Sequence, residues 1–201
     1  MIKMKTKIIA ILLVLVVAFA LPIPALACSS SYFSWTWNSG TSSLSVQLFP
    51  SAYNFYDLVY DNYTQWNSIS TKVGINGFTY YTNGANQGKD IEVIGAALSG
   101  DTTGVTDIYS KNILGVFTYQ NIGSYTGKVS KVIISIDTSG NFTGMTSARQ
   151  KKTVIHEFGH SLALAHPSCT NSALMHQNSH ANVSLSITTH DKDNLKAKWG
   201  N

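Results

Sequence analysis

Residues 156–166 of the chain read His-Glu-Phe-Gly-His-Ser-Leu-Ala-Leu-Ala-His, and this stretch decides how the rest is interpreted. Positions i and i+4 of an α-helix lie on one face, so His156 and His160 can hold one metal ion between them. Glu157 follows the first of them and can take a proton from a water molecule on the metal without being a ligand. A chain that turns back after the helix brings His166 to the same ion. Three imidazoles that leave one position open for water are typical of catalytic zinc, so the stretch predicts a Zn²⁺ site.

The segments before this stretch alternate between strand and helix patterns. Apolar runs, some alternating with polar residues, predict strands over 44–48, 90–98, 113–119 and 129–137. Residues 100–110 are expected to form a loop. Strands interleaved with helices indicate a single α/β or α+β domain.

Apolar residues three and four positions apart predict two long helices, over 51–68 and 147–164. Residues 166–187 have no clear period and predict an irregular segment. Thr188 and Asp191 have the spacing of a capping pair, which predicts a last helix that runs to Trp199.

Residues 156–167, HEFGHSLALAHP, resemble the zinc-binding consensus H-E-x-x-H-x-x-G-x-x-H of the metzincin metallopeptidases. Within that clan they are most similar to the matrixins, the matrix metalloproteinase group. Ala173-Leu174-Met175, nine residues after His166, resembles the methionine turn that lies beneath the zinc. The resemblance extends to a last helix from Asp191 to Trp199.

This resemblance implies an α+β catalytic domain of the zincin type, with a twisted, mostly parallel sheet packed on the two long helices. A small irregular C-terminal subdomain would end in the last helix. It also implies a zinc endopeptidase in which His156, His160 and His166 bind Zn²⁺ and Glu157 is the general base. The substrate would be a protein or peptide lying extended along an exposed sheet edge, with Met175 below the metal.

Ala163 departs from the metzincin pattern. It occupies the position of a glycine at which the chain turns sharply out of the zinc-binding helix. An alanine that adopts the left-handed conformation there costs about 1–2 kcal/mol. The departure concerns the geometry of the turn and leaves the ligands in place.

The first 27 residues predict a secretory signal peptide. Lysines at positions 3, 5 and 7 precede an apolar run over 8–21 and the small residues Ala25-Leu26-Ala27. The run is shorter than the roughly 20 residues that span a bilayer. We therefore expect a secreted catalytic domain over 28–201.

The two cysteines leave three alternatives open. Cys28 and Cys169 could form a disulfide in an oxidising exterior, which would contribute about 4–5 kcal/mol in the chain-entropy model. Cys28 directly follows the expected cleavage site, so it could instead carry a lipid, or it could be free. The residues do not decide among these fates.

Charge and composition exclude other classes of partner. The net charge is +4, and without the lysines of the signal peptide the chain has 11 basic and 10 acidic residues. A nucleic-acid binder keeps a basic face, so we expect no nucleic-acid partner. We also expect a monomer, with no membrane contact unless Cys28 is lipidated.

Two functions compete with the peptidase. A zinc-binding or adhesion module without activity would have no need of Glu157, which is present. A surface lipoprotein whose main role is attachment would depend on a lipid at Cys28.

Overall fold

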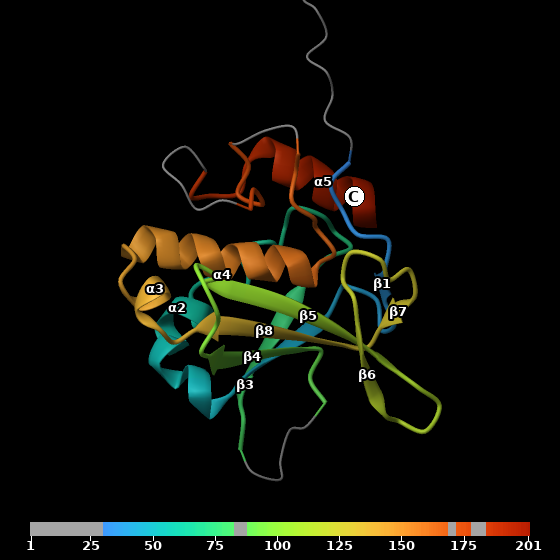
Figure 1. The fold of residues 1–201 in the computed structure, drawn as a ribbon. Coiled ribbons are helices and arrows are strands. Elements are labelled where there is room, and N and C mark those ends of the chain that lie inside the picture. The colour runs from blue at the N-terminus through green and yellow to red at the C-terminus, as the bar shows by residue number, and fades with distance from the viewer. Residues whose placement is uncertain (1–29, 83–87, 169–171, 178–183) are drawn as a thin grey trace, which may run out of the picture.

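The structure is a computed structural model that describes residues 30–82, 88–168, 172–177 and 184–201 (Figure 1). The expected signal peptide, Cys28 and Cys169 lie outside these residues. No helix among the described residues has the length and apolar character needed to cross a membrane.

A six-stranded mixed sheet forms the centre of the fold. In sheet order its strands are β3 (Ile75–Tyr80), β2 (Leu44–Leu48), β4 (Ile91–Ala96), β8 (Lys131–Asp137), β5 (Gly104–Lys111) and β6 (Phe117–Gln120). The first four run parallel, whereas β5 is antiparallel to both β8 and β6. The prediction of a mostly parallel sheet in a small α+β domain is therefore confirmed. A separate parallel pair joins β1 (Thr36–Trp37) to β7 (Lys128–Val129).

The helices differ widely in length. The 3₁₀-helix η1 (Pro50–Phe55) leads into α2 (Tyr56–Tyr60), and α3 (Gly140–Thr143) precedes α4 (Ser147–Ser161). The last helix is α5 (Thr189–Trp199). Helix α4 packs on the sheet, where it contacts β5 and β8 (Figure 1).

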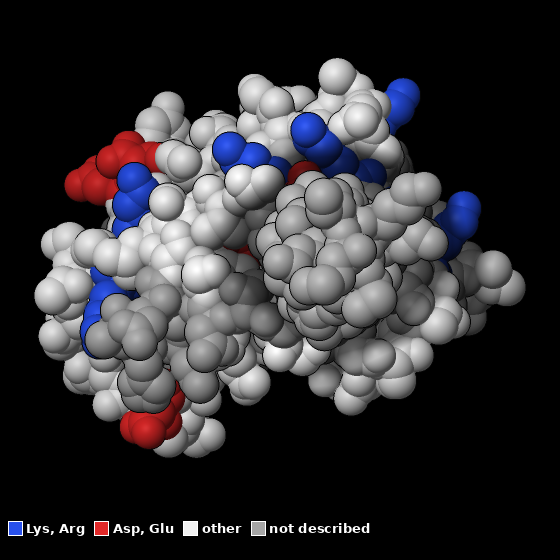
Figure 2. All heavy atoms as spheres, turned by 90° about the horizontal axis from the view of Figure 1, so that it is seen from above, with Lys and Arg blue, Asp and Glu red and all other residues white. Residues whose placement is uncertain are grey.

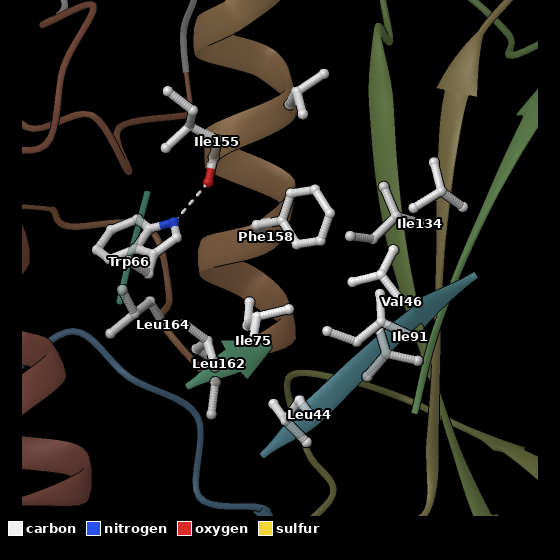
Figure 3. Packing of buried hydrophobic residues seen from close by; sticks show 14 of the residues in the cluster. Leu44, Val46, Trp66, Ile75, Ile91, Ile134, Ile155, Phe158, Leu162 and Leu164 are labelled. Atoms are coloured by element: carbon white, nitrogen blue, oxygen red, sulfur yellow. Dashed lines mark hydrogen bonds between the residues drawn. The ribbon is translucent and has the colours of Figure 1, made fainter. Parts of the chain in front are cut away.

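The core lies between α4 and the sheet. Phe158 of α4 points at Ile134 of β8, with Val46 and Ile91 of the neighbouring strands beside it (Figure 3). All four side chains are fully buried. Burying an aliphatic or aromatic side chain of this size contributes about 1.5–3 kcal/mol, so these contacts fix α4 on the sheet.

Trp66 ties the segment after α2 to the same helix. Its indole N–H donates to the backbone oxygen of Ile155 over 2.8 Å, and its side chain is fully buried (Figure 3). Helix α2 also contacts α4. These contacts hold the segment after β2 against α4.

The prediction of one long helix over 51–68 is wrong. Regular α-helix covers only α2, and turns follow it to Ser68, which has a φ of 67°. Asn62 donates its side-chain N–H to the oxygen of Leu58 over 2.7 Å. Short polar side chains that bond to the backbone favour turns, and this segment is rich in them.

Two strands of the central sheet were missed. Residues 100–110 were expected to form a loop, yet β5 begins at Gly104 and lies inside the sheet. Strand β3 contains Asn76-Gly77, a pair typical of turns, and it is accommodated because β3 is an edge strand.

The strand expected over 113–119 is only partly formed. Strand β6 begins at Phe117, and the preceding residues form the turn of a hairpin with β5. The expected strands at 44–48, 90–98 and 129–137 correspond to β2, β4 and β8.

The last helix matches its prediction. Thr188 and Asp191 form a complete capping box, in which each side chain accepts a hydrogen bond from the other residue's backbone N–H. The helix ends at Trp199.

On the face seen in Figure 2, which looks down on the molecule of Figure 1, charged side chains of the described residues are sparse and separated.

Trp66→Phe should lower the free energy of unfolding by about 1–3 kcal/mol, because it removes buried ring volume and a hydrogen bond. Urea unfolding followed by circular dichroism measures this change. Tyr60→Phe is the matched control, since Tyr60 is 46% exposed, and should change stability by less than about 0.5 kcal/mol. Equal effects of the two changes on the free energy of unfolding would contradict a stabilising role for the contact between Trp66 and α4.

Candidate metal centre

Helix α4 carries two of the predicted ligands, His156 and His160. His156 and His160 are 5% and 7% exposed and are separated by one helical turn. The residues between them include Phe158, which faces the sheet core and fixes the rotation of the helix. The two imidazoles therefore point away from the core packing and toward one side of α4.

The chain leaves α4 through a left-handed residue. Ala163 has a φ of 63°, as expected for the metzincin glycine position. The N–H groups of Ala163 and Leu164 donate to the oxygens of His160 and Gly159 over 2.9 and 3.1 Å. This pair of bonds is a Schellman motif, which ends the helix and reverses the chain.

The reversal brings His166 back to the helix. Its Nε2 lies 3.0 Å from Nε2 of His156 and 3.0 Å from Nε2 of His160. His166 itself is exposed, whereas the other two rings are buried. Within the part of the chain that the structure describes, these three form the one group of His, Cys, Asp or Glu that could hold a metal ion.

Two backbone carbonyls fix the protonation of the buried rings. Nδ1 of His156 lies 3.0 Å from the oxygen of Leu174, and Nδ1 of His160 lies 2.8 Å from the oxygen of Leu164. A carbonyl oxygen only accepts, so each Nδ1 must carry the hydrogen. In the neutral imidazole this leaves Nε2 with a lone pair directed at the other rings.

The neutral state is favoured by the surroundings. Burial lowers the pKa of His156 well below its usual value and that of His160 to about 4. Desolvation and the neighbouring His160 also lower the pKa of His166. Nitrogen lone pairs that face one another at 3.0 Å repel, and a cation placed among them removes that repulsion. The donor set thus fits a zinc ion held by three imidazoles.

Glu157 lies beside the cluster but is not part of it. Its carboxylate accepts a hydrogen bond from the Thr106 hydroxyl over 2.7 Å, and the side chain is only 5% exposed. Burial raises the pKa of Glu157 to about 7, although the Thr106 bond and the charge of Lys152 oppose the rise. A carboxyl group with this pKa can both accept and release a proton near neutral pH.

Strand β5 shapes the pocket of that carboxylate. A Cβ on Gly104 would lie 2.8 Å from Oε1 of Glu157, so any other residue here would force the carboxylate to move. The role of Thr106 could not be predicted from the sequence, because residues 100–110 were expected to form a loop. The β-branched residues Val105, Thr106 and Ile108 are the sequence signal that could have indicated the strand.

The turn that contains Met175 packs beneath the ligand helix. Met175 is 2% exposed, and a Cβ on Gly159 would lie 2.3 Å from its sulfur. Glycine at this position therefore lets the turn approach α4 closely. The same turn presents the oxygen of Leu174 to His156.

Helix α5 holds this turn through Asp191. The buried carboxylate accepts hydrogen bonds from the N–H groups of Leu174 and Met175 over 2.9 and 3.2 Å. It also accepts from the backbone N–H and hydroxyl of Thr188. Asp191, which belongs to the capping box of α5, thereby positions the Leu174 carbonyl that orients His156.

The segment near the N-terminus supports the other side of the site. The N–H of Phe33 donates to the oxygen of Ala163 over 2.7 Å, and the N–H of Ala165 donates to Ser31 over 2.9 Å. The Phe33 ring centre lies 5.9 Å from that of His160. This segment has no sequence period and gave no signal of its role.

A cleft of about 790 Å³ opens onto the three histidines and Glu157. Its walls are formed by residues 104–106 of β5, the side of α4 from Arg149 to His160, and Phe33. Lys152 lies in the wall, where burial lowers the pKa of its ammonium group and Nζ donates to the oxygen of His176. The cleft is large enough for a segment of chain rather than a single small ion.

The remaining histidines have other surroundings. His176 and His190 are not members of the metal cluster, and His190 contacts the side chain of Asn194. His180 lies outside the described residues. The interpretation of these residues as ordinary surface or loop histidines stays a prediction.

Comparisons with known proteins give little beyond this geometry. No protein-family model matches the sequence, and no curated protein matches it either. One similar solved structure is described as "Structure of myroilysin", with 12% sequence identity and a TM-score of 0.49. The match covers 83% of this chain and 96% of that chain.

Asp191→Asn should destabilise the protein by about 2–3 kcal/mol, because an amide N–H would replace a buried oxygen that accepts backbone hydrogen bonds. It should also weaken zinc binding roughly tenfold, since the Leu174 carbonyl behind His156 loses its support. Thermal unfolding and competition with a fluorescent zinc chelator measure the two effects. Asp193→Asn, an exposed change on the same helix, is the control, and unaltered zinc affinity in Asp191→Asn would contradict the role given to α5.

Proposed function

We propose that this chain is a secreted, zinc-dependent endopeptidase of the metzincin type, closest to the matrixins. The observation that carries the proposal is the pairing of two features. Three neutral imidazoles direct Nε2 at a common centre, and a buried carboxylate that is not a ligand lies beside them. Secretion follows from the signal-peptide pattern of residues 1–27.

The residues support a hydrolytic role for a bound metal. His156, His160 and His166 would hold Zn²⁺, which in such a site acidifies a water molecule and polarises a carbonyl group. Glu157 accepts a proton from the attacking water and passes it to the departing amine nitrogen. The C–N bond breaks, and the products are a carboxylate and an amine.

The cleft has an edge on which a peptide can be held. Strand β6 pairs with β5 only over Ile108–Lys111 in the described structure, so residues 104–106 have one edge without a neighbouring strand. These residues line the cleft beside Glu157. An extended peptide that adds to this edge would lie with its backbone across the metal site.

The main alternative is a zinc-binding module without activity, either soluble or attached through a lipid on Cys28. A structural zinc site has no use for a buried carboxylate outside its ligand set, and burying Glu157 is costly. Its hydrogen bond to Thr106 and the space at Gly104 favour the catalytic reading. Mass analysis of the mature N-terminus would detect a lipid.

Glu157→Gln should lower the rate of peptide cleavage by about 10²–10⁴-fold, because the amide cannot take up the proton. Its oxygen can still accept the Thr106 hydrogen bond, so zinc content and folding should be unchanged. His160→Ala should lower zinc content and activity together, because it removes a ligand. Casein and a quenched-fluorescence peptide library serve as substrates, with zinc measured by atomic absorption. A zinc-loaded parent that cleaves neither would favour the silent module.

Thr106→Val should lower kcat about tenfold with little change in KM, since it keeps the side-chain shape but removes the hydrogen bond that orients Glu157. Thr106→Ser retains a hydroxyl and should restore most of the rate. Zinc content should be equal in both variants. If valine and serine give the same kcat, Thr106 does not position the carboxylate.

A further inference from the structure

The turn of the β5–β6 hairpin exposes an unusual amount of apolar surface. Five of the ten large apolar side chains that are exposed among the described residues lie between positions 113 and 119. Ile113 is completely exposed, and Leu114 is 82% exposed. Figure 1 shows this hairpin extending beyond the sheet, away from α4 and α5.

The shape of the turn does not depend on these apolar side chains. The side-chain oxygen of Asn112 accepts hydrogen bonds from the N–H groups of Leu114 and Val116, over 2.9 and 3.0 Å. The backbone of Asn112 bonds in addition to Val116 and Gly115. Gly115, with a φ of +83°, allows the tight reversal. Ile113 and Leu114 are thus presented outward by a turn that is already ordered.

Basic and aromatic groups lie directly behind the tip. Residues 108–136 contain no Asp or Glu, but they contain Lys111, Lys128 and Lys131. The ammonium groups of Lys111 and Lys131 lie 5.3 and 4.8 Å from the ring centre of Phe117. Lys131 also pairs with Glu92 of β4, at 3.3 Å.

We propose that this hairpin docks the protein on an anionic lipid bilayer. From the tip inward, aliphatic side chains come first, then Phe117 level with Lys111, and then Tyr119 level with Tyr109 and Lys131. This order follows the depth profile of a membrane surface, with its hydrocarbon, its interfacial layer and its negative headgroups. A convex apolar tip needs no complementary pocket in a fluid bilayer, which favours lipid over a protein partner.

The near-neutral charge of the whole chain gives no sign of this surface, because the acid-free stretch is balanced by carboxylates elsewhere.

The cleft lies near the other end of β5. Five residues separate Thr106 from Lys111, which corresponds to about 17 Å of strand. Docking through the tip would therefore leave the cleft open to a substrate near the membrane surface.

Sedimentation with vesicles tests the proposal without any measurement of activity. The purified protein should bind vesicles of phosphatidylcholine and phosphatidylglycerol, and bind phosphatidylcholine vesicles much more weakly. The double change Ile113→Ser and Leu114→Ser should lower the partition coefficient by at least about tenfold, since both side chains lose the gain from entering hydrocarbon. Lys111→Gln should lower binding to the anionic vesicles about fivefold and leave binding to neutral vesicles unchanged.

Leu185→Ser is the matched control, because Leu185 is 47% exposed outside the hairpin, and its binding should equal that of the parent. A parent that sediments with neither vesicle overturns the proposal, as does a double variant that binds like the parent. Attachment through a lipid on Cys28 would also make the double variant bind like the parent. A parent that dimerises without lipid through the hairpin, as shown by analytical ultracentrifugation of both proteins, would assign the surface to a second copy of the chain instead.

Discussion

The site depends on two hydrogen bonds from imidazole Nδ1 atoms to backbone carbonyls. The carbonyls of Leu174 and Leu164 decide which nitrogen of His156 and of His160 carries the hydrogen. They thereby direct both Nε2 lone pairs at the position to which His166 returns. The spacing of two histidines at i and i+4 on a helix does not by itself orient their rings. Without these two acceptors, the rings could rotate or bind a proton in place of a metal.

Much of the fold around the site holds those two carbonyls in place. Leu164 follows the left-handed residue Ala163, and the segment around Phe33 pairs with the same stretch of chain. Leu174 lies in the turn that is hydrogen-bonded to the Asp191 carboxylate at the start of α5. The packing of Phe158 on the sheet sets the rotation of α4, so that the histidines face the cleft. Elements far apart in the sequence therefore converge on one local requirement, the orientation of two rings.

Sequence reasoning predicted what is encoded locally. The helix that bears His156 and His160 follows from periodicity, the return of His166 from motif spacing, and the capping box of α5 from the pair Thr188 and Asp191. The motif position predicted a sharp turn at Ala163, and the structure shows that this residue is left-handed.

Tertiary context decided the rest. Strand β5 lies inside the sheet although its sequence is polar at the start, and it supplies Thr106, which could not be connected with Glu157 before the fold was known. The long helix expected over 51–68 is cut short by side chains such as Asn62 that bond to the backbone. The outward turn at Ile113 and Leu114 was expected to be part of a strand, because apolar residues on a protruding hairpin have the same local pattern as those in a strand of the sheet.

X-ray absorption at the zinc K-edge of the zinc-loaded protein tests the central claim most directly. We expect three imidazole ligands with nitrogen atoms at about 2.0–2.1 Å from the zinc and one further light-atom ligand. A sulfur ligand at about 2.3 Å, or fewer than three imidazoles, would contradict a site built from His156, His160 and His166 with an open position for water.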